Sequence, residues 1–188
     1  MTIAATAAIL SSSSRSTSPA QDLSERIDVR AREITVNMPP PYGKITGYHL
    51  YIVYVDPARR QFVCEGFPFD PATGSIPPAG ATLFYGLSGL LTQGYCGTLL
   101  QRATVQQQQE QQHFVTVLYG GEAEKAYRCF EKETGRFNAE RIPYRMATGP
   151  NSNSFVRMML DRCDVPAIKP PAAVPVPGWE ISLSRQAA

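Results

Sequence analysis

The chain has 188 residues, 43% of them hydrophobic and 10% aromatic, and a formal net charge of +2 at pH 7. This length and composition are typical of one globular domain with tails. The small net charge gives no reason to expect binding to nucleic acid or to an anionic membrane. No apolar run in the sequence is long enough to span a bilayer.

The four cysteines, Cys64, Cys96, Cys129 and Cys163, are widely spaced. No Cys-x-x-Cys pair occurs, so we expect no zinc site and no cofactor. The even count permits two disulfides, but each cysteine lies among apolar residues, where free thiols are common. We therefore favour free thiols.

Residues 1–22 are rich in Ala, Ser and Thr and contain few large apolar side chains. This composition predicts a disordered N-terminal tail. The segment lacks the basic start and the strongly apolar centre of a secretory signal peptide. We therefore expect a cytoplasmic protein, or one exported by a specialised route.

Three strands are predicted before the middle of the chain. Alternating apolar residues indicate a strand over 26–38, with a change of phase near Arg32 that suggests a bulge or a break. Residues 47–56, GYHLYIVYVD, are apolar in both phases, which is typical of a central strand covered on both faces. Residues 61–69 follow a short turn and match a hairpin partner. Several glycines leave 81–104 without a clear prediction.

The second half adds a strand and two helices. The glutamine-rich run 106–112 is expected to be solvated, and 113–119 is predicted to be a strand. A helix should follow from about 122 to 134, with Gly135 as its C-cap. A second helix is predicted over about 153–162 from its apolar periodicity.

These elements predict an α+β domain over residues 23–165, in which one or two helices pack on an antiparallel sheet. Prolines exclude a helix from residues 166–188. We expect that segment to be an extended C-terminal tail that follows the surface, anchored by Trp179.

Residues 151–155, NSNSF, lie at the start of the second helix, and helical phase turns Ser152 toward its apolar face. Backbone N–H groups at a helix start, here near Asn153, can donate to a developing oxyanion. A hydroxyl becomes a nucleophile only when a base takes its proton. His49, inside the apolar strand 47–56, is the candidate base because a buried histidine needs a polar partner.

The NSNSF sequence, with a strand histidine far upstream, resembles the circularly permuted papain-like fold. That group includes the PPPDE peptidases, the lecithin:retinol acyltransferase relatives and the permuted NlpC-type enzymes. The resemblance covers about residues 45–165 and implies a papain-like sheet, with His49 as general base and Ser152 as nucleophile where the family carries cysteine. It also implies a third residue on the following strand that orients the imidazole, and a carboxylate there, Glu65, would suit a serine nucleophile. The residues expected around the oxyanion are Asn151, Asn153 and Ser154.

Three functional hypotheses follow. The first is a Ser–His hydrolase or acyltransferase that acts on an amide or ester of a protein or lipid through an acyl-enzyme intermediate, as a bacterial effector or toxin could. The second is a catalytically inactive papain-like module that binds a protein partner, with the proline-rich tail and the glutamine run as contact segments. The third is a structural or assembly protein of a larger complex.

The same residues also have a plain structural interpretation. Ser152, Asn153 and Ser154 are all good N-cap residues. His49 can be a core histidine whose hydrogen bonds are satisfied by its neighbours.

Overall fold

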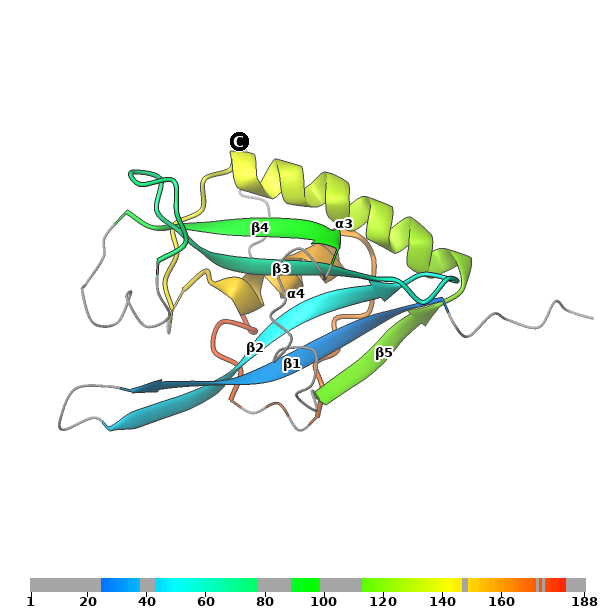
Figure 1. The fold of residues 1–188 in the computed structure, drawn as a ribbon, viewed down its shortest axis with the longest axis horizontal. Helices are drawn as coiled ribbons and strands as arrows, with labels where there is room; N and C mark the ends of the chain where they lie inside the picture. Colours follow the sequence, from blue (N-terminus) through cyan, green and yellow to red (C-terminus); the bar gives the residue numbers. More distant parts are fainter. Residues whose placement is uncertain are drawn as a thin grey trace, which may run out of the picture.

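The computed structural model describes residues 25–37, 43–77, 89–98, 113–146, 149–171, 173 and 175–181. Within these ranges a five-stranded antiparallel sheet of order β4-β3-β2-β1-β5 carries two helices on one face (Figure 1). The strands are β1 (Arg26–Asn37), β2 (Lys44–Val55), β3 (Gln61–Phe69), β4 (Leu91–Thr98) and β5 (His113–Tyr119). The helices are α3 (Gly121–Ala139) and α4 (Ser152–Arg162). The expected α+β class, with an antiparallel sheet and two packed helices, is confirmed.

The central strand β2 is buried on both of its faces, as its sequence predicts. Successive side chains of a strand point to opposite faces. Leu50 and Ile52 belong to the main core beneath the helices, whereas Tyr51 and Val53 form a smaller cluster on the other face. Ile52 and Val53 are both fully buried. This alternation fixes the direction of every side chain along β2.

The first strand is regular where a bulge was expected. β1 pairs with β2 in one unbroken register from Arg26 to Asn37, so the predicted bulge near Arg32 is wrong. The far end of the β1–β2 hairpin extends beyond the two helices (Figure 1). A register shift does occur on the other side of β1, where the pairing with β5 slips between Ile27 and Asp28.

Helix α3 continues past its predicted end, so Gly135 is not its C-cap. Gly135 lies where an added Cβ would meet nothing, and a glycine inside a helix costs only about 1 kcal/mol relative to alanine. Phe137, one half-turn further on, is fully buried. Burying a phenylalanine side chain contributes about 1.5–3 kcal/mol, which outweighs the cost of the glycine.

Two glycines allow helix α4 to approach the sheet closely. An added Cβ would lie 2.3 Å from Phe155 Cε2 at Gly94 and 2.7 Å from Phe155 Cβ at Gly66. Phe155 is fully buried and meets Phe137 edge-on, with 5.1 Å between ring centroids. A glycine inside a strand often marks such an approach. Gly94, one of the glycines that obscured β4 in the sequence, is therefore a packing requirement of α4.

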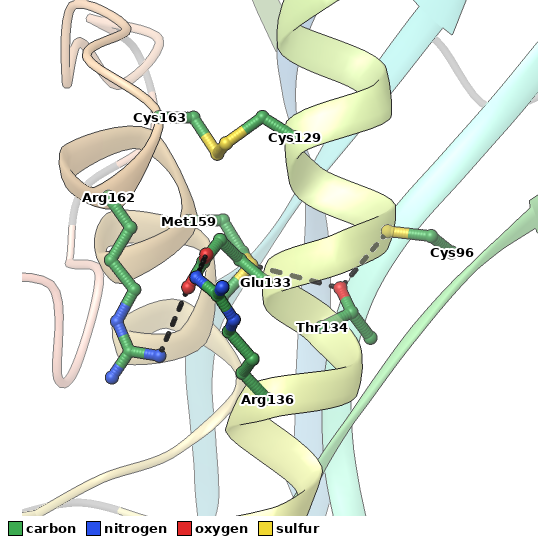
Figure 2. The surroundings of a disulfide bond; sticks show 8 residues. All are labelled: Cys96, Cys129, Glu133, Thr134, Arg136, Met159, Arg162 and Cys163. Carbon is green, nitrogen blue, oxygen red and sulfur yellow. Dashed lines mark hydrogen bonds and ion pairs between the residues drawn. A yellow bond between two sulfur atoms is a disulfide. The ribbon is translucent and has the colours of Figure 1, made fainter.

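Two disulfide bonds cross-link the domain, so the expectation of free thiols is wrong. Cys64 and Cys96 are directly opposite residues of β3 and β4. Cys129 of α3 is bonded to Cys163 at the C-terminal end of α4 (Figure 2). Disulfides require a narrow range of Cα separations. Strand register and helix packing decide which cysteines come that close, and sequence spacing alone does not.

The proline-rich sequence after α4 is packed against the domain. We call residues 175–181 the C-terminal strap. Trp179 is buried in the main core, and the Arg157 guanidinium lies 5.6 Å from the centroid of its ring. The Tyr48 N–H of β2 donates to the Pro175 carbonyl at 3.1 Å. The strap therefore runs beside β2 rather than standing away from the sheet.

Candidate functional site

His49 and Glu65 are in direct contact, with 3.1 Å between His49 Nε2 and Glu65 Oε2. An ionised carboxylate only accepts hydrogen bonds, so Nε2 is the donor and Nδ1 is the free acceptor of the neutral ring. The imidazole also stacks on Tyr51 at 6.2 Å between centroids, and Arg32 Nη2 lies 3.7 Å from Glu65 Oε2. The structure thus brings together the predicted base and the carboxylate predicted to orient it.

Burial holds the pKa of His49 below its ordinary value, because a desolvated imidazolium is disfavoured. The Glu65 hydrogen bond acts in the opposite direction, and the positive charge of Arg32 adds to the lowering. The neutral imidazole is therefore the form that the folded protein favours near pH 7.

We expect His49 to make the protein less stable as the pH falls from about 7 to about 5. Its folded-state pKa lies below the unfolded-state value of about 6.5, so unfolding takes up a proton in this range and stability rises with pH. Urea denaturation at both pH values should show a smaller loss in His49→Gln than in the wild type. His113→Gln, at the exposed start of β5, is the matched control. An equal loss in His49→Gln and wild type would contradict this role.

Ser152 is the first residue of α4 and lies on the other side of the sheet from the imidazole. Its Cα would be 3.1 Å from a Cβ added at Gly66, and its hydroxyl interacts with the Tyr144 phenol, which opposes the rise that burial gives the pKa of that phenol. Leu50 faces the core that α4 covers, so His49, one residue earlier in β2, projects from the opposite face. No hydrogen bond joins Ser152 to His49 within the described ranges. The structure therefore does not bring the predicted nucleophile to the predicted base.

Asn151 is the N-cap of α4. Its Oδ1 accepts from the backbone N–H groups of Asn153 at 2.9 Å and Ser154 at 3.2 Å, and Ser154 completes a capping box. Its Nδ2 donates to the carbonyls of Met146 and Pro177. The Asn153 N–H expected to stabilise an oxyanion is thus already hydrogen-bonded within the helix cap.

Asn153 takes the place of a neighbouring strand along part of β2. Its Oδ1 accepts from the Leu50 N–H at 2.8 Å, while its Nδ2 donates to the Tyr48 carbonyl at 2.9 Å and the Pro177 carbonyl at 2.8 Å. The pairing of β2 with β3 ends at Ile52, so Tyr48 and Leu50 lie where β3 no longer provides partners. We call this arrangement the Asn153 clasp.

Ser154 completes the attachment of the helix start to the C-terminal strap, because its Oγ donates to the Gly178 carbonyl at 2.7 Å. NSNSF is the helix start that its sequence predicts, and it also binds both β2 and the strap, which was not predicted. The available signal was the amide side chain, which carries a donor and an acceptor and can imitate a peptide group. Nothing in the sequence indicates which backbone groups the amide would pair with.

Among the described residues, no group of three or more His, Cys, Asp or Glu side chains could hold a metal ion. No helix in those ranges is both long enough and apolar enough to cross a membrane. Protein-family models, curated proteins and solved structures contain no match to this chain.

Proposed function

We propose that the chain is a catalytically inactive module of the papain-like type that binds another protein. The order of the histidine strand and the NSNSF helix start supports the papain-like assignment. The inactivity rests on one observation: Ser152 is directed to Tyr144, while His49 projects from the other face of the sheet. A serine hydroxyl without a base in contact is a weak nucleophile.

The two disulfides support a location outside the reducing cytosol. Such bonds form and persist in oxidising compartments and are rare in cytosolic proteins. Both cysteine pairs, Cys64–Cys96 and Cys129–Cys163, are bonded, which leaves no free thiol among the described residues. Of the two locations expected from the sequence, we therefore propose the exported one.

A Ser–His hydrolase or acyltransferase is the second candidate, and the hydrogen bond between His49 and Glu65 favours it. A neutral imidazole oriented by a carboxylate is the arrangement that a general base needs. This function would require Ser152 to leave Tyr144 and reach His49 Nδ1, so that it could attack an amide or ester carbonyl.

We expect a serine-directed fluorophosphonate probe to leave the wild-type protein unlabelled, because no base activates the Ser152 hydroxyl. Intact-mass spectrometry after incubation would measure this. Ser152→Cys should gain reactivity toward a thiol probe, since a thiol ionises without strong base catalysis. Wild-type labelling that disappears in Ser152→Ala and persists in the matched variant Ser154→Ala would reject inactivity and favour the hydrolase.

A further inference from the structure

The two edge strands of the sheet, β4 and β5, differ in how far their outer backbone groups are hydrogen-bonded. At the β4 edge, the Asn138 side chain accepts from the Gly94 N–H at 2.7 Å and donates to the Gly94 carbonyl at 3.0 Å. The Thr92 N–H at the same edge donates to the Ile142 carbonyl at 2.7 Å. At the opposite edge, β5 pairs with β1, and no other described residue pairs with its outer side. Among the described residues, the edge at β5 is therefore the one to which no strand or side chain is paired.

β5 also lacks the side chains that usually keep an edge strand from pairing with another molecule. Its sequence, HFVTVLY, contains no lysine, no proline and no acidic residue. Edge strands in monomeric proteins commonly carry charges or prolines that prevent such pairing. Two antiparallel copies of β5 would meet without opposing like charges.

The exposed aromatic residues of β5 lie on one face of the sheet. Phe114 is 59% exposed and Tyr119 is 43% exposed. Phe114 is opposite Arg30 and Tyr119 is opposite Arg26, and both arginines bond to Asp28 on the face away from the helices. The register shift between β1 and β5 brings these two aromatic residues onto the same face although five positions separate them.

We propose that β5 pairs antiparallel with β5 of a second copy of the chain, so that the two five-stranded sheets become continuous across a two-fold axis. Phe114 and Tyr119 lie on one face of each strand, so both exposed rings border the seam, where the aromatic residues of the partner subunit pack against them. Strands of seven residues bury less surface than a standard interface, so the dissociation constant is on the order of micromolar or weaker.

Sedimentation equilibrium of the whole chain tests this self-association. Between about 1 µM and a few hundred µM, the mean mass should rise from the 20.6 kDa monomer toward twice that value. Phe114→Lys and Tyr119→Lys should each raise the dissociation constant at least about tenfold, because two lysines then face the partner's aromatic rings and add charge to the strand.

Ile168→Lys is the matched control, since Ile168 is an apolar residue of similar exposure, 48%, outside β5. It should leave the dissociation constant unchanged, with circular dichroism confirming that all three variants are folded. A protein that stays monomeric over the whole range would overturn the proposal. So would Phe114→Lys and Tyr119→Lys variants that dimerise like the wild type, or an Ile168→Lys variant that weakens the dimer as much as they do.

Discussion

Replacing Asn153 by alanine should lower the free energy of unfolding by about 3–5 kcal/mol. The substitution leaves the Leu50 N–H and the Tyr48 carbonyl without the amide that pairs with them, while the Pro177 carbonyl keeps its bond from Asn151. Each buried polar group left unpaired costs about 1–3 kcal/mol. Asn153 is 4% exposed and Leu50 is fully buried, so water has little access to replace the lost bonds. Urea denaturation at neutral pH measures the loss as a lower midpoint.

Asn138→Ala is a control with the same chemistry in a more exposed place. Asn138 also uses one amide to pair with a backbone N–H and carbonyl, both of Gly94, but it is only partly buried at the β4 edge. We expect a loss of about 1 kcal/mol there, because water can take over part of the pairing. If Asn138→Ala and Asn153→Ala lowered the free energy of unfolding equally, the idea that burial makes the Asn153 clasp more stabilising would be wrong.

The second large effect concerns the link between the two helices. Replacing Cys129 and Cys163 together by alanine should reduce stability by about 3–4 kcal/mol, because the unfolded chain regains the freedom of a long closed loop. The two cysteines are 34 residues apart in the sequence. Urea denaturation of the double variant and the wild type, without reductant, measures this difference.

Ion pairs that join the same helices remain in that double variant. Arg162 of α4 lies 3.7 Å from Glu133 Oε2 and 2.9 Å from Glu140 Oε1, and Figure 2 shows Glu133 between Arg162 and Arg136. The helices should therefore stay docked, with native circular dichroism at low urea. Addition of dithiothreitol should destabilise the wild type at least as much as the double substitution does. A wild type whose midpoint is unchanged by reductant would contradict the role of the disulfides.

Local patterns in the sequence predicted much of the sheet. The apolar run of β2 indicated a strand buried on both faces, and the same run followed by residues 61–69 indicated a hairpin. The contact between His49 and Glu65 was expected from the resemblance, and the hairpin accounts for it, since only 16 residues separate the two side chains. Within a hairpin, strand alternation is enough to place two side chains on one face.

Features that depend on distant packing were not predictable. Gly94 made β4 hard to predict as a strand. The glycine is needed there because Phe155, from a helix far along the chain, packs against its Cα. The helical phase of Ser152 was deduced correctly as inward. Inward for α4, however, is the face of Leu50 and not the face of His49. The helical phase of Ser152 and the strand alternation around His49 could both be predicted from the sequence. The face of the sheet that α4 covers could not.

The C-terminal strap has a consequence for the order in which the chain can fold as it is synthesised. Asn151 and Asn153 both donate to the Pro177 carbonyl, and Ser154 donates to that of Gly178. These bonds cannot form on the ribosome until residues 175–178 have emerged, although β2 is translated more than 100 residues earlier. Until then the Tyr48 N–H on the β2 edge lacks its partner, the Pro175 carbonyl, and an uncovered strand edge invites association with other chains. Completion of this domain is therefore a late event in translation, and the interval before it is the period of greatest exposure to aggregation.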